Sequence, residues 1–133
     1  MGFLGKKPVA TSSQRGLQAE TQALTYLQAA GMKLLERNYR TPGRGGGEID
    51  LILRDRDGTL VFVEVRSRNT LQFGGAAASI VAGKQRRIIL AARHYLLKYV
   101  VLPPCRFDVV SVQSTAQSDA PNIEWLKAAF DAS

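Results

Sequence analysis

The fold of this chain is decided by two strand-like stretches, Gly47-Glu48-Ile49-Asp50-Leu51-Ile52 and Val61-Phe62-Val63-Glu64-Val65-Arg66. Both stretches are largely apolar on each of their two faces, which is typical of strands in the interior of a sheet. Each stretch nevertheless carries an acid where such a strand normally has an apolar residue, Asp50 in the first and Glu64 in the second. Burying a carboxylate is costly unless the carboxylate has a partner. These two acids are therefore the first candidates for a functional site.

The turn between the two stretches, Asp55-Arg56-Asp57-Gly58, determines whether the two acids meet. A three-residue hairpin loop with Gly58 in the left-handed conformation pairs the first residue of the turn with Thr59. Because side chains alternate between the faces of a strand, this register sets Asp50 directly opposite Glu64. A two-residue loop would instead turn the two acids to opposite faces of the sheet. We expect the three-residue loop, in an antiparallel hairpin whose acids face each other.

Two acids that face each other predict a bound cation. Like charges directly opposite in a sheet are unfavourable by roughly 0.2–1 kcal/mol, and by more in a dry site. A divalent cation held by Asp50 and Glu64 would remove this cost, and oxygen ligands suit Mg²⁺ or Mn²⁺. The alternative is a structural one, in which Glu48 forms an ion pair with Arg66 and Asp50 merely caps or bends an edge strand.

A third acid lies on the core-facing side of the first predicted helix. This helix begins at Ser12 or Ser13, which can cap it, and runs to about residue 30, where Gly31 ends it. Its apolar stripe consists of Leu17, Ala23, Leu24, Leu27 and Ala30. Glu20 falls on the same stripe, so it either pairs with a buried base or faces the same cavity as Asp50. A surface position at the edge of the stripe is the alternative.

The remaining elements complete a single α/β domain. They are a strand at 32–40, a glycine-rich loop at 41–47 that we expect to be flexible and substrate-facing, a helix at about 82–99, a strand at 106–113 and a last strand at 123–130. The predicted order is α-β-β-β-α-β-β, with a mixed central sheet of about five strands flanked by helices. The second helix then connects two parallel neighbouring strands. Residues 1–13 are expected to be a flexible basic tail, and residues 14–133 one domain.

Composition restricts the class of protein further. The chain has 133 residues, of which 45% are hydrophobic and 22% charged, as in folded soluble domains. It contains no apolar run of the roughly 20 residues that a membrane helix needs, so we expect no membrane association. With Cys105 as the one cysteine, no intrachain disulfide can form, and a cytoplasmic location is expected.

The distribution of charge predicts a polyphosphate partner. The formal net charge is +7, and eight bases without a single acid lie between Val65 and Phe107. Such a concentration of one sign is typical of nucleic-acid-binding surfaces, although a basic surface can also serve solubility alone. The residues that we expect to contact nucleic acid are Arg44, Arg68, Lys84, Arg86, Arg87 and Arg93.

Several motifs together resemble a known superfamily. They are Arg15-Gly16-Leu17-Gln18-Ala19-Glu20, Arg37-Asn38-Tyr39-Arg40, the two stretches quoted first, Lys84-Gln85-Arg86-Arg87-Ile88 and Arg106-Phe107-Asp108-Val109-Val110. In combination they resemble the restriction-endonuclease-like nucleases, whose signature is written PD-(D/E)-x-K. Within that superfamily the chain is similar to the YraN-type family of uncharacterised bacterial proteins, itself similar to archaeal Holliday junction resolvases. The resemblance covers roughly residues 15–130.

The resemblance implies a three-layer fold and a metal-dependent endonuclease acting on DNA, with branched or repair intermediates as candidate substrates. Glu20, Asp50 and Glu64 would hold Mg²⁺ or Mn²⁺, with Arg66 as a fourth catalytic residue. Arg66 stands where the superfamily normally has lysine; arginine cannot act as a base but binds phosphate bidentately. Arg66 or Lys84 could then stabilise the transition state. The alternative is a nucleic-acid-binding protein without turnover. DNA is the expected partner in both cases, and homodimer formation is left open.

Overall fold

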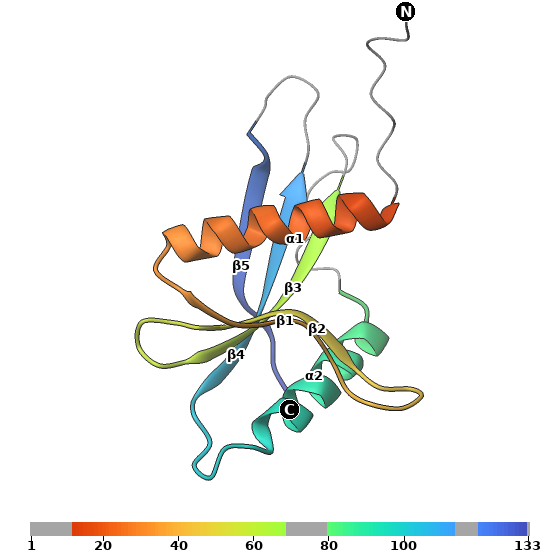
Figure 1. The fold of residues 1–133 in the computed structure, drawn as a ribbon, viewed down its shortest axis with the longest axis vertical. Coiled ribbons are helices and arrows are strands. Elements are labelled where there is room, and N and C mark those ends of the chain that lie inside the picture. The colour runs from red at the N-terminus through yellow and green to blue at the C-terminus, as the bar shows by residue number, and fades with distance from the viewer. Residues whose placement is uncertain (1–11, 69–79, 114–119, 133) are drawn as a thin grey trace, which may run out of the picture.

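The computed structural model describes residues 12–68, 80–113 and 120–132 (Figure 1). Its elements are α1 (Ser12–Ala29), β1 (Lys33–Arg40), β2 (Glu48–Arg54), β3 (Leu60–Arg68), α2 (Ala82–Leu96), β4 (Cys105–Gln113) and β5 (Asn122–Phe130). The predicted order α-β-β-β-α-β-β is confirmed. Most of the predicted basic tail, residues 1–11, lies outside the described residues.

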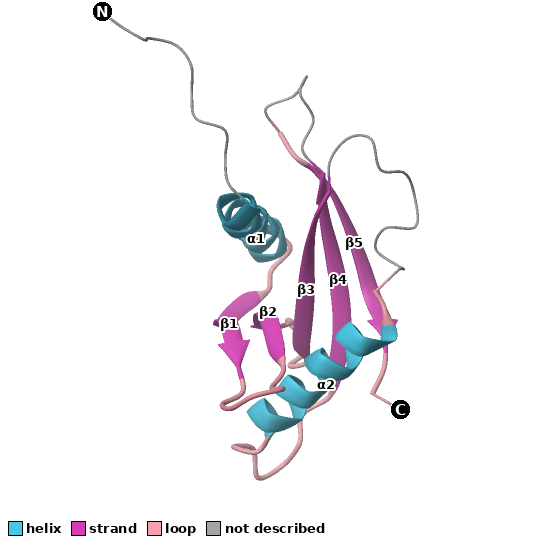
Figure 2. Cartoon of the chain, turned by 90° about the vertical axis from the view of Figure 1, so that its right-hand side faces the viewer, coloured by secondary structure: helices cyan, strands magenta, loops and turns pink. Residues whose placement is uncertain are grey.

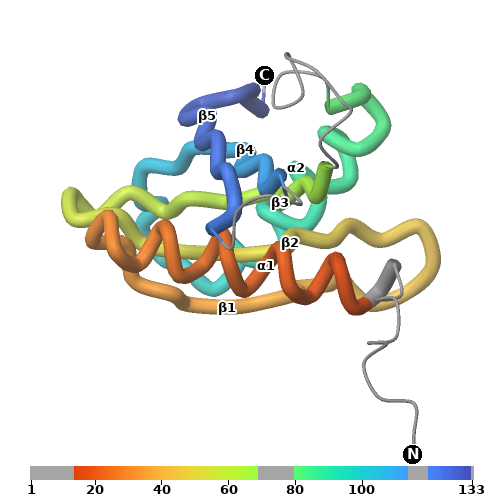
Figure 3. The backbone as a smooth tube through the Cα atoms, turned by 90° about the horizontal axis from the view of Figure 1, so that it is seen from above, coloured from red at the N-terminus to blue at the C-terminus, as the bar shows by residue number. Residues whose placement is uncertain are grey.

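The five strands form one sheet in the order β1-β2-β3-β4-β5, which Figure 3 shows from above. Neighbouring strands are antiparallel except for β3 and β4, which run parallel and are connected through α2. The sheet is therefore mixed, and the crossover predicted for the second helix is confirmed. A parallel pair requires such a crossover, because a tight turn can join only antiparallel strands.

The two helices cover opposite faces of this sheet (Figure 2). Alternation along β3 divides the core: Val61 and Val63 pack towards α1, whereas Phe62 packs towards α2. The α1 side of the core consists of small and aliphatic residues, and the α2 side is rich in aromatic rings. The architecture is the three-layer α/β arrangement expected from the sequence.

The stripe predicted for α1 is wrong at Leu17, whose exposed fraction is 55%. The helix instead buries Ala19, Ala23 and Leu27 against the sheet. At 100° per residue, Leu17 lies about a quarter turn away from the centre of this buried face. Ala30 of the predicted stripe is exposed as well. The buried face is therefore shifted towards Ala19 relative to the predicted stripe. Gly31 ends the helix region with a positive φ of 98°, as expected.

Candidate functional site

The turn that joins β2 to β3 has the predicted three-residue loop. The backbone N–H of Asp55 donates to the carbonyl oxygen of Thr59 at 2.9 Å, and that of Gly58 donates to Asp55 at 3.0 Å. Gly58 adopts a φ of 91°, the left-handed conformation that this loop requires. This turn fixes the register of the ladder between β2 and β3, whose last pair is Leu51 and Val63. The next residues along the two strands are Asp50 and Glu64.

The sheet forks at these two acids. The ladder between β2 and β3 ends at Leu51 and Val63, whereas β2 continues along β1 to its first residue and β3 continues along β4 to Arg68. At the fork, the carboxylate oxygen Oδ2 of Asp50 accepts a hydrogen bond from the backbone N–H of Val65 at 2.8 Å. The Asp50 side chain thus connects the two strands where their backbone ladder stops.

The charges at the fork are unbalanced. Burial, together with the nearby negative charge of Glu64, raises the pKa of Asp50 to about 7. The Glu64 side chain is buried as well, with an exposed fraction for the residue of 4%. Its oxygen Oε2 lies 2.6 Å from Nζ of Lys84, which reaches the site from α2. Two carboxylates therefore share one ammonium group, which leaves one negative charge without compensation from this group.

Glu20 reaches the same region from α1. Burial raises its pKa, and the negative charge of Asp50 raises it further. Its oxygen Oε1 lies 3.7 Å from Nη2 of Arg37 and, within the described residues, has no hydrogen-bond partner. Glu20 therefore pairs with a base, as one of the two alternatives predicted, and it also interacts electrostatically with Asp50. That Glu20 faces the same cavity as Asp50 stays a prediction.

A cluster of three metal ligands is not formed by the side chains in their present positions. Across residues 12–68, 80–113 and 120–132, no three or more His, Cys, Asp and Glu side chains lie close enough together to hold a metal ion. The structure brings Asp50 and Glu64 together as a pair, with Glu20 further away. The assignment of Glu20 as a third ligand stays a prediction.

Two residues predicted to contact nucleic acid, Arg68 and Lys84, line one cavity together with Arg66, which was predicted to be catalytic. This cavity has a volume of about 320 Å³ and includes Glu64, Arg66, Arg68 and Lys84 in its lining. Burial lowers the pKa of Arg66, and the positive charge of Arg68 lowers it further. A guanidinium nevertheless stays protonated in proteins, so both arginines present positive charge to this cavity.

The other predicted basic residues lie elsewhere. Arg44, Arg86 and Arg93 are exposed and line neither this cavity nor the one at the glycine-rich loop. Arg87 is exposed on α2, and its Nη2 lies 4.0 Å from Oε1 of Glu48. The sequence therefore indicated that basic residues lie on the surface. It did not indicate which of them lie beside the acids.

The ion pairs of Glu48 differ from the predicted one. Its Oε2 lies 3.3 Å from Nε of Arg40, and Arg87 approaches its other oxygen. The paired part of the hairpin ends before Glu48 can lie opposite Arg66 in the ladder. The structural alternative of a Glu48–Arg66 pair is therefore wrong, because it assumed that the ladder continues past the fork.

Three residues of β1 belong to the site without having been assigned a role from the sequence. Arg37 and Asn38 contact Glu20, and Arg40 contacts Glu48. The available signal was their position, since they directly precede the glycine-rich loop and the acidic strand. Asn38 also has a positive φ of 51°, which is uncommon outside glycine.

Within the described part of the chain, none of the helices is long and apolar enough to cross a membrane.

The fold and the acidic fork together define an α/β protein of the restriction-endonuclease-like type. The chain belongs to the family described as "Uncharacterised protein family UPF0102", whose model matches residues 19–112. A "UPF0102 protein" of Paracidovorax citrulli is 60% identical over 140 residues, covering 99% of both chains. Similar relatives are a "UPF0102 protein" of an Acidovorax species, 58% identical and covering 99% of both chains, and one of Verminephrobacter eiseniae, 57% identical and covering 98% of this chain and 96% of the relative.

Proposed function

We propose that this protein is a metal-dependent endonuclease that hydrolyses phosphodiester bonds in DNA. The observation that carries the proposal is the buried contact of Glu64 with Lys84, beside Asp50 at the fork of the sheet. A purely structural ion pair needs one acid and one base, whereas here a second acid, Asp50, adjoins the buried Glu64. The resemblance of the sequence motifs to the PD-(D/E)-x-K nucleases supports the same reaction.

The residues at the fork fit a magnesium or manganese ion. Hard divalent cations prefer oxygen ligands, and Asp50 and Glu64 supply two carboxylates in a place where their charges oppose each other. The buried Oε1 of Glu20 is a further oxygen that lacks a hydrogen-bond donor within the described residues. When bound, such an ion lowers the pKa of a water molecule and polarises a phosphoryl oxygen.

The side chains around the acids have separate tasks in this proposal. Asp50 is oriented by the N–H of Val65, which engages one carboxylate oxygen. The side-chain hydrogen bond between Asp50 and Glu64 would give way to the ion, which both acids would then hold. Lys84 can exchange Glu64 for a phosphate oxygen once the acids are neutralised, and its ammonium group then stabilises developing negative charge. Lys84 thereby supplies, from α2, the positive charge that the superfamily's lysine supplies from the position of Arg66.

The test is a cleavage assay on labelled linear, flapped and four-way DNA, with and without Mg²⁺ or Mn²⁺. We expect metal-dependent cleavage that Asp50→Asn and Glu64→Gln both abolish. Glu124→Gln is the matched control because it removes an exposed carboxylate on β5, and it should cleave like the wild type. Calorimetric titration with Mn²⁺ gives a second readout, and equal binding by the wild type and Asp50→Asn would remove the metal site from consideration.

A second function is favoured by one observation, the arginine at position 66. Without a lysine there, the same fold and basic surface could bind nucleic acid and not cleave it. This function predicts salt-dependent binding to DNA together with intact substrate in every cleavage reaction, whichever metal is added. Cleavage that depends on Asp50 would exclude it.

A further inference from the structure

A second polar cavity lies at the glycine-rich loop between β1 and β2. It has a volume of about 290 Å³, and its charged lining residues are Arg40, Glu48 and Arg87. Thr41 and several glycines of the loop form the rest of the lining. None of these residues contributes a carboxylate to the acidic pair, so the cavity is distinct from the one beside Glu64.

The loop that forms this cavity has a defined shape. The N–H of Thr41 donates to the carbonyl oxygen of Gly47 at 3.1 Å, and the N–H of Gly47 donates back to Oγ1 of Thr41 at 2.8 Å. Gly47 packs directly on α2, since a Cβ atom placed on it would lie 1.9 Å from the carbonyl oxygen of Arg87. The two ends of the loop are therefore tied together, and one wall of the cavity is backbone without side chains, while the flexibility of the loop stays a prediction.

The charges of the cavity favour an anion. Two guanidinium groups, those of Arg40 and Arg87, share the single carboxylate of Glu48 at 3.3 Å and 4.0 Å. One positive charge is left in excess, the reverse of the balance at the acidic pair. Both arginine side chains are more than half exposed, so a ligand can reach them.

The position of the cavity relates it to the acidic pair. Arg87 follows Lys84 by three residues on α2, so the two side chains lie on one helix face about 5–6 Å apart at Cβ. Glu48 likewise precedes Asp50 by two residues on β2. A nucleic-acid strand advances by about 3.4 Å per nucleotide along the helix axis. One or two nucleotides therefore span the separation between Lys84 and Arg87.

We propose that this cavity is a phosphate subsite, which binds the phosphate one or two nucleotides away from the one that lies against Lys84. The inference rests on the proposed function for its place along the strand. Arg40 and Arg87 are the phosphate ligands, and the glycine wall lets the phosphate approach the backbone. Glu48 holds both arginines in the absence of nucleic acid and competes with the phosphate for them.

The competition by Glu48 gives the proposal a characteristic test. We would measure binding of fluorescein-labelled DNA by anisotropy in EDTA, so that no cleavage occurs, across a series of salt concentrations. Arg40→Ala and Arg87→Ala should each weaken binding several-fold and reduce the log–log salt slope on duplex DNA by about 0.9. Glu48→Gln should instead strengthen binding several-fold, because it releases both arginines. That gain should vanish when Glu48→Gln is combined with the two arginine variants.

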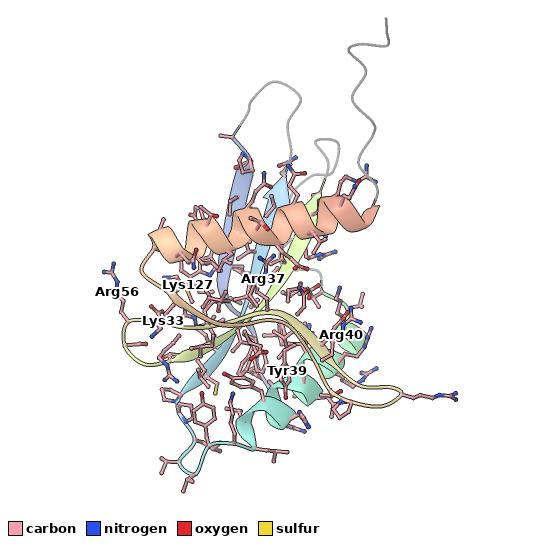
Figure 4. All side chains as sticks on the ribbon, viewed as in Figure 1. Lys33, Arg37, Tyr39, Arg40, Arg56 and Lys127 are labelled. Carbon is pink, nitrogen blue, oxygen red and sulfur yellow. The ribbon has the colours of Figure 1, made fainter. Side chains whose placement is uncertain are left out.

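Lys33→Ala is the matched control. Lys33 is exposed at the opposite end of β1 from Arg40, as Figure 4 shows, and its loss should change binding much less than the loss of Arg40. Thermal unfolding of each variant identifies any that lose their fold. The bound phosphate could lie within the DNA strand or at its 5′ end. Oligonucleotides with and without a 5′-phosphate separate these two cases, since only a subsite for the strand end responds to removal of the end phosphate.

The outcomes separate this proposal from the proposed function. Equal effects of Lys33→Ala, Arg40→Ala and Arg87→Ala would overturn the subsite, whether or not the protein cleaves DNA. A Glu48→Gln variant that binds more weakly than the wild type would also overturn it, because Glu48 would then serve only the structure of the loop. The predicted binding pattern without any cleavage would support the subsite and reject the nuclease.

Discussion

At the scale of single residues, Asp50 shows how the protein keeps an acid in an unfavourable place. Burial and the neighbouring Glu64 both favour its protonated form, and the N–H of Val65 only partly opposes them. The protein retains the acid because its side chain replaces the ladder at the fork. A residue that costs stability and orders the backbone at once is typical of functional sites.

The first prediction concerns this cost as a function of pH. The pKa of Asp50 is raised from 3.8 to about 7, so the folded state holds a proton that the unfolded state loses between these values. The free energy of unfolding therefore falls as pH rises through this window, and the full cost is present above about pH 7. Asp50→Asn keeps an acceptor for Val65 and removes the titration. As pH rises from 3.8 to about 7, we expect the variant to gain stability relative to the wild type, by at most about 1.4 kcal/mol per pH unit.

Urea unfolding in EDTA at several pH values measures this difference. Glu124→Gln serves as the control, since its exposed carboxylate should leave the pH profile unchanged. Parallel profiles for the wild type and Asp50→Asn would show that the acid is not strained in the folded protein.

The second prediction concerns Arg66. If Lys84 or Arg66 stabilises charge on the phosphate, Arg66→Lys should preserve or raise the rate of DNA cleavage, because lysine restores the group usual in the superfamily. Arg66→Ala should lower the rate while costing little stability, since Glu48 is held by Arg40 and Arg87. Single-turnover cleavage and thermal melts of the same proteins measure both effects. Arg56→Lys, in the hairpin turn, is the control, and loss of cleavage in Arg66→Lys would contradict the prediction.

At the scale of elements, α2 organises the whole site. Its first turns carry Lys84 to one cavity and Arg87 to the other. Lys84 lies on the same face of the helix as Ile88 and Tyr95, which are buried in the core. The glycine-rich loop is seated on the same helix through Gly47. The spacing between the two cavities is thus set by one helical turn rather than by a loop, which makes it rigid.

The third prediction tests the contact between Gly47 and α2, with Gly16 as the comparison. Gly47→Ala places a Cβ within 1.9 Å of backbone oxygen and 2.8 Å of backbone nitrogen in α2, so we expect a loss of about 1–3 kcal/mol in the free energy of unfolding. Gly16→Ala in α1 meets nothing within 4 Å and should stabilise by about 0.5–1 kcal/mol, because alanine favours helix. Chemical denaturation measures both. A stabilising Gly47→Ala would mean that the loop does not rest on the helix.

At the scale of the whole molecule, positive charge prevails, while two acids, Asp50 and Glu64, meet at the fork. The net charge is +7, yet the pair at the fork carries an excess of negative charge. Long-range attraction can therefore bring a polyanion to the surface, while the local field at the fork favours a cation. A protein that needs both a metal ion and a nucleic acid requires this separation.

The fourth prediction concerns the basic surface as a whole. Replacing Arg86 and Arg87 by alanine should flatten the log–log salt slope of duplex DNA binding by about 1–2 units, at about 0.9 per phosphate contact. The control replaces Lys33, at the start of β1, and Arg56, in the turn between β2 and β3, and so removes the same charge on the opposite side of the molecule from Arg40 (Figure 4). Anisotropy titrations at several salt concentrations compare the two. Equal slopes would show that net charge alone governs binding.

The sequence by itself determined the features that depend on near neighbours in the chain. Turn chemistry at Gly58 fixed the hairpin register, and alternation then placed Asp50 next to Glu64. Element order and the parallel crossover through α2 followed from periodicity and from the rules of connection. These features are local, because a turn type or a strand period involves only a few consecutive residues.

Only the tertiary structure decided how the elements rotate and how far the strands stay paired. Three features depend on how the helices are rotated over the sheet. They are the exposure of Leu17, the ion pair of Lys84 with Glu64 and the ion pair of Arg87 with Glu48. Buried Asp108 is a further case, since it accepts hydrogen bonds from Arg106, from Trp125 and from the N–H of Ala128.

Trp125 and Ala128 are distant from Asp108 in the sequence, so no local pattern encodes their contacts with it. The fork itself arises because β2 remains paired with β1 and β3 with β4 after their own ladder has ended. The position at which the β2–β3 ladder ends therefore depends on the packing of the whole domain. Local propensity does not decide it, because the same residues could continue as an ordinary ladder.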